Sequence, residues 1–257
     1  MRKVIERKML NSKDGKSYDF LKTPKEVEVF SSLGDLFNST TQPTEEKMRN
    51  FPVYTPRQTI ARFLIRYEMF KLIQGVHGSI VEFGVFRGAG LFSWLHFSGI
   101  LEPYNINRKI IGFDTFDGFP LPHPNDGELN KGGDLDSGAY AELNIAKKIH
   151  LENIASSHIS RMEIIKGDIC ETLPAFIKAN QHTIIALAYV DVNLYEPTKV
   201  ILESIVKRIP KGGILAFDEV NDKLAPGETI ALLEGFDLNR FHLNRFYFDS
   251  NPCYIKF

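Results

Sequence analysis

The chain has 257 residues, of which 43% are apolar and 25% charged, with 31 basic and 32 acidic residues and a formal net charge of −1. This composition is that of an ordinary globular protein, and the length suits one large α/β domain with a modest extension. The basic residues are scattered along the chain, which argues against nucleic-acid binding. No apolar run approaches the length of a membrane span, and residues 1–16 lack a secretory signal pattern, so we expect a cytoplasmic protein without a membrane partner.

Residues 1–54 combine charged and small polar residues with short apolar clusters, which predicts an N-terminal extension. The main domain is predicted over residues 55–257. Its first helix is expected to start at Thr55, because Thr55 can cap a helix and Gln58 completes a capping box. Apolar residues at helical spacing follow over residues 60–70.

Short apolar runs then alternate with helical patterns. Strands are predicted over residues 80–84, 109–114, 162–168, 184–191 and 213–218, and helices over residues 91–101, 137–154, 173–180 and 197–209. Two further strand-like runs, 241–248 and 252–257, leave no room for a helix between them and predict an antiparallel hairpin. The pattern as a whole predicts an α/β, Rossmann-like, seven-stranded methyltransferase sheet that is mostly parallel, with a C-terminal antiparallel hairpin and helices on both faces.

Glycine and acidic residues follow the predicted parallel strands. They are Gly84, Asp114, Asp168, Asp191 and Asp218. In an open α/β sheet the ligand binds beyond the carboxyl ends of the strands, so these residues are expected at one edge. Residues 120–138, rich in Pro, Gly, Asp and Asn, predict a long loop near that edge.

The segment 81–88, with the sequence VEFGVFRG, links the first predicted parallel strand to a helix. Gly84 and Gly88 would let backbone amides approach a ligand closely. The segment is not Gly-x-Gly-x-x-Gly and has no phosphate-binding lysine, which weakens a dinucleotide or nucleoside-triphosphate interpretation. A tight turn with two glycines is also a common structural device, so this segment alone leaves both readings open.

Asp114 and Asp168 extend the ligand-binding hypothesis. Asp114 ends the second predicted strand, where a carboxylate can accept both hydroxyls of a ribose, and Asp168 ends the third, toward the adenine side of such a ligand. Each acid could instead cap a helix or stabilise a turn. Together with the turn at 81–88 they favour an adenosyl ligand.

Three carboxylates at neighbouring strand ends predict a metal site. Asp191 ends the fourth strand, and Asp218 and Glu219 end the fifth. Carboxylate oxygens without soft ligands suit Mg²⁺, or else Mn²⁺ or Ca²⁺. The alternative is that these acids cap helices or pair with Lys199 or Lys223.

The chain resembles the macrocin-type O-methyltransferases, the TylF/MycF family. The matching segments are VEFGVFRG (81–88), FDTFDGFP (113–120), GD with TLP (167–168 and 172–174), DVNLYE (191–196) and GGILAFDE (212–219). They occur in the order of the family and with similar spacing over residues 55–220.

The resemblance implies methyl transfer from S-adenosylmethionine to a sugar hydroxyl, assisted by a divalent metal such as Mg²⁺. It implies that the donor is held by Glu82, Gly84, Gly88, Asp114 and Asp168, and that the metal is held by Asp191, Asp218 and Glu219. The metal would lower the pKa of the acceptor hydroxyl and aim it at the sulfonium methyl.

The chain departs from the family pattern at two positions. Where the family has Asp-x-Asp-x-Tyr, this chain has Asn193 in place of the second Asp, and an amide takes no proton at neutral pH. Either the metal alone activates the acceptor, or a loop residue such as His123 or Asp126 is the base, or catalysis is slow. Glu219 replaces an aspartate, which lengthens one expected metal ligand.

Three hypotheses follow for the whole chain. The first is an O-methyltransferase acting on a sugar hydroxyl of a nucleotide sugar, polysaccharide or glycosylated natural product, for which the polar loop 121–138 would be a lid. The second is methylation of a phenolic or other small-molecule hydroxyl. The third is a non-catalytic adenosyl-binding or assembly protein, suggested by Asn193 and the N-terminal extension, which is also compatible with a homo-oligomer.

Overall fold

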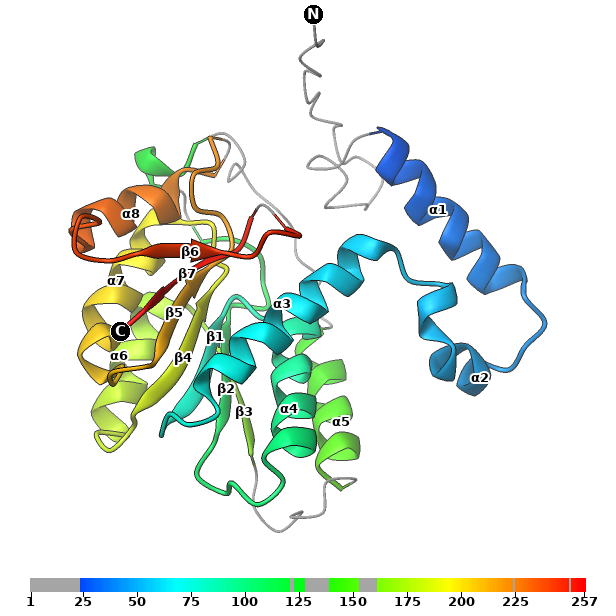
Figure 1. Ribbon diagram of the computed structural model, residues 1–257, viewed down its shortest axis with the longest axis horizontal. Coiled ribbons are helices and arrows are strands. Elements are labelled where there is room, and N and C mark those ends of the chain that lie inside the picture. Colours follow the sequence, from blue (N-terminus) through cyan, green and yellow to red (C-terminus); the bar gives the residue numbers. More distant parts are fainter. Residues whose placement is uncertain (1–23, 121–122, 128–138, 153–160, 224, 250) are drawn as a thin grey trace, which may run out of the picture. The chain divides into compact units, whose positions relative to one another are not determined.

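The computed structural model describes residues 24–120, 123–127, 139–152, 161–223, 225–249 and 251–257 (Figure 1). The chain forms two compact units, one ending at Arg62 and the other running from Phe63 to Phe257. The division into an extension of residues 1–54 and a domain of residues 55–257 stays a sequence-based prediction.

The described part of the first unit is helical. It contains α1 (Pro24–Ser39), α2 (Thr44–Arg49), the 3-10 turn η2 (Phe51–Val53) and the start of α3 (Arg57–Ile73). Lys47 is buried, and its Nζ donates a hydrogen bond of 2.5 Å to the carbonyl oxygen of Phe37 and lies 4.8 Å from the Phe37 ring centroid. Tyr54 packs edge-on against the same ring. These contacts fold the segment back on itself.

The second unit is built on one seven-stranded sheet. Its strands are β1 (Ser79–Phe83), β2 (Ile110–Asp114), β3 (Met162–Lys166), β4 (Ile185–Val190), β5 (Ile214–Phe217), β6 (Leu243–Arg245) and β7 (Cys253–Lys256). The strand order is β3-β2-β1-β4-β5-β7-β6; strands β1 to β5 pair in parallel, and β7 pairs antiparallel with both β5 and β6. The predicted sheet and its C-terminal hairpin are confirmed.

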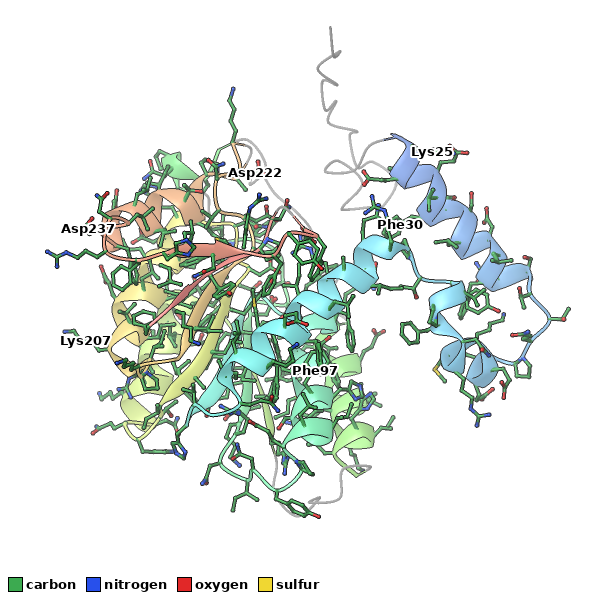
Figure 2. The ribbon with its side chains drawn as sticks, in the orientation of Figure 1. Lys25, Phe30, Phe97, Lys207, Asp222 and Asp237 are labelled. Atoms are coloured by element: carbon green, nitrogen blue, oxygen red, sulfur yellow. The ribbon has the colours of Figure 1, made fainter. Side chains whose placement is uncertain are left out.

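Helices cover both faces of this sheet (Figure 1). They are α4 (Ala89–Leu101), α5 (Ala139–Glu152), α6 (Ile169–Ala179), α7 (Tyr195–Ile205) and α8 (Gly227–Gly235), together with α3 and the short turns η3 (Pro124–Asp126) and η4 (Val206–Arg208). One apolar cluster joins the sheet to α6, α7 and α8, and a second joins it to α3, α4 and α5. In the second cluster, Phe97 of α4 packs against three aromatic rings of α3 (Figure 2).

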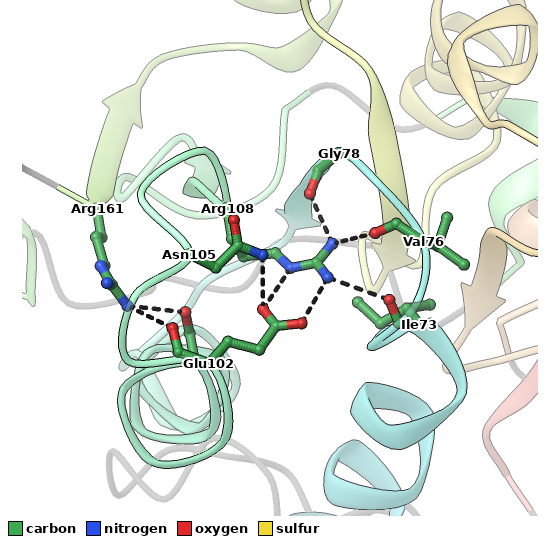
Figure 3. Close-up of polar contacts among 8 residues, drawn as sticks. Ile73, Val76, Gly78, Glu102, Asn105, Arg108 and Arg161 are labelled. Carbon is green, nitrogen blue, oxygen red and sulfur yellow. Dashed lines mark hydrogen bonds and ion pairs between the residues drawn. The ribbon is translucent and has the colours of Figure 1, made fainter.

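Two buried arginines stabilise the amino ends of β2 and β3 (Figure 3). Arg108 forms a buried ion pair with Glu102 and donates to the carbonyl oxygens of Ile73, Val76 and Gly78. Arg161 donates to the carbonyl oxygens of Glu102 and Pro103 and to Ser98 Oγ. Ile73 is the last residue of α3 and Glu102 is the C-cap of α4, so the arginines bind carbonyl groups that helix ends leave without an intrahelical donor. The network lies opposite the carboxyl edge of the sheet.

Candidate active site

The turn after β1 brings the backbones of β1 and β4 close together. The Asp191 amide donates a hydrogen bond of 2.8 Å to the Phe83 carbonyl oxygen. Gly84 follows with a φ of +87°, and a Cβ at that position would lie 1.9 Å from the Asp191 carbonyl oxygen. Glycine is therefore required by both conformation and space. This point lies where the strand order reverses, between β1 and β4, which is where α/β sheets bind ligands.

Asp114 holds the turn in shape. Its Oδ2 accepts hydrogen bonds of 2.7 Å from the amides of both Val85 and Phe86, and its Oδ1 accepts one of 2.8 Å from the Phe116 amide. Phe86 and Phe116 both have positive φ angles, which are uncommon for residues other than glycine. Asp114 thus stabilises two strained turns at the carboxyl edge of the sheet. These hydrogen bonds agree with the alternative to ligand binding, in which Asp114 stabilises a turn.

Glu82 lies buried on β1 beneath the start of α4. Its Oε2 accepts a hydrogen bond of 2.7 Å from the Trp94 indole, and a Cβ on Gly90 would lie 2.0 Å from its Oε1. Burial raises the pKa of Glu82 to about 7; Arg66 and the Trp94 hydrogen bond oppose this shift. The carboxyl group of Glu82, beside the turn that follows β1, therefore changes between its charged and neutral forms near neutral pH.

Gly88 and Asp168 both cap helices at this edge. Gly88 has a φ of +84° and precedes α4, whose first turn has no side-chain cap. Asp168 caps α6 and accepts a hydrogen bond of 2.8 Å from the Cys170 amide. The structure thus gives Asp168 the capping role that the sequence left open beside donor binding.

The expected metal ligands lie at the ends of β4 and β5. Asp218 and Glu219 are buried, and the Tyr189 hydroxyl donates a hydrogen bond of 2.5 Å to Asp218 Oδ1. Among the residues that the structure describes, no three His, Cys, Asp or Glu side chains are grouped so that they could hold a metal ion. As placed, Asp191, Asp218 and Glu219 do not fit the expected metal site.

Glu228 of α8 organises the ends of β4 and β5, and it was not among the site residues predicted from the sequence. The side chain is fully buried; its Oε1 accepts hydrogen bonds of 2.9 Å from the amides of Val192 and Asn193, and its Oε2 accepts one of 3.2 Å from the Glu219 amide. The pKa of Glu228 is raised to about 7, mainly by burial and also by Asp218, although the hydrogen bonds from the amides oppose this shift. These contacts join positions 35, 36 and 9 residues apart, so no local motif signals them.

Asn193 stands in a strained and enclosed position. Its φ is +60°, its amide is held by Glu228, and its side-chain Oδ1 is buried without a hydrogen-bond partner. Buried polar atoms are usually paired, so this oxygen is suited to a ligand group.

The described part of the loop after β2 packs on the start of α7. Asp126 is buried, and its carboxylate accepts hydrogen bonds of 2.5 Å from the amides of Tyr195 and His123. His123 stacks on the Tyr195 ring at 4.6 Å, and its Nδ1 accepts a hydrogen bond of 3.2 Å from the Asn125 amide. With Nδ1 as acceptor, a neutral His123 carries its proton on Nε2, which does not suit a general base. Both side chains therefore fix the loop; most of the expected lid, residues 121–122 and 128–138, lies outside the described residues.

The predicted donor residues thus meet at one edge of the sheet, although each makes structural contacts there. Arg66 of α3 is a further charged residue near this edge, and no sequence pattern predicted it. It lies over the Tyr189 ring, at 5.3 Å from the centroid, within electrostatic reach of Glu82 and Asp218.

Comparison with known proteins identifies the family. The sequence model of the TylF macrocin O-methyltransferases matches residues 66–231. The chain belongs to the macrocin O-methyltransferase family. It is accordingly an S-adenosylmethionine-dependent O-methyltransferase with a methyltransferase fold, as predicted.

Solved structures agree with this assignment. The calicheamicin methyltransferase CalS11 is 34% identical, with a TM-score of 0.84, and the match covers 91% of this chain and 93% of that chain. An apo structure, described as TDP-rhamnose 3′-O-methyltransferase CalS11, is 34% identical with a TM-score of 0.82 over 91% and 95% of the two chains. The O-methyltransferase NovP, 20% identical with a TM-score of 0.53 over 76% of this chain and 78% of that chain, shares the fold.

No match was found among curated protein sequences. Within the part of the chain that the structure describes, no helix combines the length and apolar character needed to cross a membrane.

Proposed function

We propose that this O-methyltransferase transfers the methyl group of S-adenosylmethionine to a sugar hydroxyl, in a nucleotide sugar or a glycosylated natural product. The observation that carries the proposal is the 34% identity over 91% of the chain to an enzyme described as a TDP-rhamnose 3′-O-methyltransferase. A deoxyhexose attached to a nucleoside diphosphate is therefore the first acceptor to test.

The donor site in this proposal consists of the residues around the β1 turn. Gly84 and Gly88 allow the positive φ angles of the turn over residues 84–88, the donor turn, which is proposed to receive the donor. Glu82 faces the methionine end of the donor. Asp114 orders the turn by binding three amides, and the acceptor capacity that remains on its carboxylate is proposed for a ribose hydroxyl. Asp168 caps α6 on the proposed adenine side.

The acceptor hydroxyl is proposed to lie between the donor methyl group and Asp191. Its oxygen attacks the methyl carbon, the bond from that carbon to sulfur breaks, and S-adenosylhomocysteine leaves. Asp191, partly exposed at the end of β4, orients the hydroxyl and receives its proton, while Asn193 Oδ1 accepts a hydrogen bond from a neighbouring group of the acceptor. Much of the rate enhancement in such a transfer comes from alignment of the two reacting atoms.

The experiment that tests this function is an acceptor screen with S-adenosylmethionine. Formation of S-adenosylhomocysteine is measured with TDP-deoxyhexoses, free sugars, glycosylated natural products and catechols. Turnover restricted to sugars supports the proposal. Turnover restricted to phenols would replace it with the small-molecule alternative, and donor binding without any turnover would favour a non-catalytic adenosyl-binding protein.

Metal dependence is a separate expectation, which rests on the resemblance. It is tested by comparing turnover in EDTA with turnover in added Mg²⁺. Activation by Mg²⁺ would require the carboxylates of Asp191, Asp218 and Glu219 to move closer together than they are in this structure, so that they could surround the ion. Equal turnover in both conditions would remove the metal from the mechanism.

A further inference from the structure

Arg66 is a cation enclosed among acidic groups on one face of the sheet. Its guanidinium carbon lies 5.3 Å from the ring centroid of Tyr189, whose hydroxyl is bound to Asp218. Its side chain is partly buried, and its Nε is fully buried without a hydrogen-bond partner. Since a buried N–H group is rarely left unpaired, this position is suited to a group that the protein itself does not supply.

Arg66 remains charged in this environment. Burial alone would lower the pKa of its guanidinium, but the nearby Tyr189, Glu82, Asp218 and Asp191 raise it above the ordinary value. Glu82 and Tyr189 are neighbours in the register of β1 and β4, so their side chains leave the sheet on the same face. A guanidinium and the Glu82 carboxyl group therefore face the same region, next to the donor turn.

The donor carries matching charges. The methionine end of S-adenosylmethionine has an α-ammonium and an α-carboxylate, and the adjacent sulfonium gives the donor a net positive charge. The acids on this face favour a ligand of that net charge, but its carboxylate requires a cation close by. A planar guanidinium binds a carboxylate through parallel N–H donors, which a lysine cannot reproduce.

We infer that Arg66 binds the α-carboxylate of the methionine moiety of S-adenosylmethionine, while Glu82 accepts its α-ammonium. Arg66 is thus a donor-binding residue contributed by the helix that precedes β1. The inference concerns the donor only, so it holds for any acceptor that the enzyme uses.

The test compares S-adenosylmethionine with decarboxylated S-adenosylmethionine, which lacks only this carboxylate. Calorimetric titration of the wild-type protein should give about 10- to 100-fold tighter binding of the complete donor, the range expected for hydrogen bonds to a charged group. In Arg66→Met the ratio of the two dissociation constants, that of decarboxylated S-adenosylmethionine to that of the complete donor, should fall to about threefold or less. The main reason is that the complete donor binds more weakly. Arg66→Lys should retain part of the ratio.

Two further variants make the test specific. Lys71→Met changes an exposed cation on the same helix, paired with Glu68, and should leave the ratio unchanged. Arg87→Met changes an exposed arginine in the donor turn, which lies 5.6 Å from the Phe86 ring centroid. If this ratio of dissociation constants fell in Arg87→Met and stayed at the wild-type value in Arg66→Met, the inference would be overturned.

A purely structural role would give a different pattern. Arg66→Met would then weaken both ligands by the same factor and preserve the ratio, which contradicts the inference. Because the ratio is taken within one variant, a smaller folded fraction changes the titration stoichiometry and leaves the ratio intact. If the wild-type protein bound neither ligand, donor dependence itself would fail, and that result is distinct from loss of the ratio.

Discussion

Gly84 is the residue at which a single added carbon has the clearest consequence. In Gly84→Ala the new Cβ would clash with the Asp191 carbonyl oxygen, 1.9 Å away, and the φ of +87° would be strained. We expect a loss of about 1–3 kcal/mol of unfolding free energy and at least about tenfold weaker donor binding. Urea unfolding and calorimetry measure the two effects.

Gly75→Ala is the matched control for this change. A Cβ on Gly75 meets no atom within 4 Å, so its unfolding free energy should change by no more than about 0.5 kcal/mol. Equal stability and donor affinity in the two variants would show that the close approach of β1 and β4 is not required.

Asn193 tests how the acceptor is deprotonated. Its Oδ1 is enclosed and unpaired, so Asn193→Asp would place a carboxylate in a buried position, where its pKa rises toward the range of a useful base. We expect kcat to stay the same or to rise, with a rate that increases with pH across the neutral range. A large loss of kcat at every pH would show that the amide itself is needed.

Individual site residues differ in how far sequence reveals them. Gly84 and Asp114 were predicted because a glycine turn and an acid at a strand end are local patterns. Arg66 and Glu228 were missed because their partners lie on other elements; Glu228 binds amides 35 and 36 residues away. Burial of a charged side chain on a helix is visible only after the helix is packed.

At the scale of elements, the buried pair Arg108–Glu102 connects α3, α4 and β2 far from the proposed site. Arg108→Met removes the cation from Glu102 and leaves three carbonyl oxygens without their donor. We expect a loss of about 3–5 kcal/mol of unfolding free energy, with kcat/KM per folded molecule unchanged. Thermal melting and active-site titration measure this.

The exposed pair Arg240–Asp237 provides the comparison. Arg240→Met should change stability by less than about 1 kcal/mol, because solvent screens an ion pair whose side chains are 80% and 51% exposed. A similar small effect in Arg108→Met would show that the buried network contributes little.

The elements were predicted to different degrees for physical reasons. The strands and α3 were found because apolar runs and a capping box are local signals. Helix α8 was not predicted, since it begins at Gly227, follows Pro226 and has no side-chain cap. The N-terminal residues were expected only as an extension, yet α1 and α2 form there with exposed apolar side chains, for example Leu36 and Met48. Weak amphipathic patterns in exposed helices give the sequence little to detect.

For the whole molecule, two buried carboxyl groups set a pH dependence of stability. Burial raises the pKa of both Glu82 and Glu228 from 4.5 to about 7. A group whose pKa is higher in the folded protein stabilises the fold while it is protonated, so this contribution is complete below pH 4.5 and is lost as the pH rises through about 7. We therefore expect the free energy of unfolding to fall between pH 5 and pH 8, by about 5 kcal/mol for the two groups together.

The variant Glu82→Gln isolates one of these groups. Its unfolding free energy, measured by urea denaturation, should depend less on pH over this interval than that of the wild-type protein. The exposed Glu203→Gln should retain the wild-type slope. Identical slopes in all three proteins would contradict the assignment of the pH dependence to burial of Glu82.

The most direct test of the central claim is one reaction mixture of enzyme, S-adenosylmethionine and a TDP-deoxyhexose. S-adenosylhomocysteine is quantified, and the position of the new methyl group is determined by nuclear magnetic resonance. The account predicts one equivalent of S-adenosylhomocysteine for each methyl ether formed on a sugar hydroxyl. Saturable donor binding with no methylated sugar from any nucleotide sugar or glycoside, while a phenol is methylated, would contradict it.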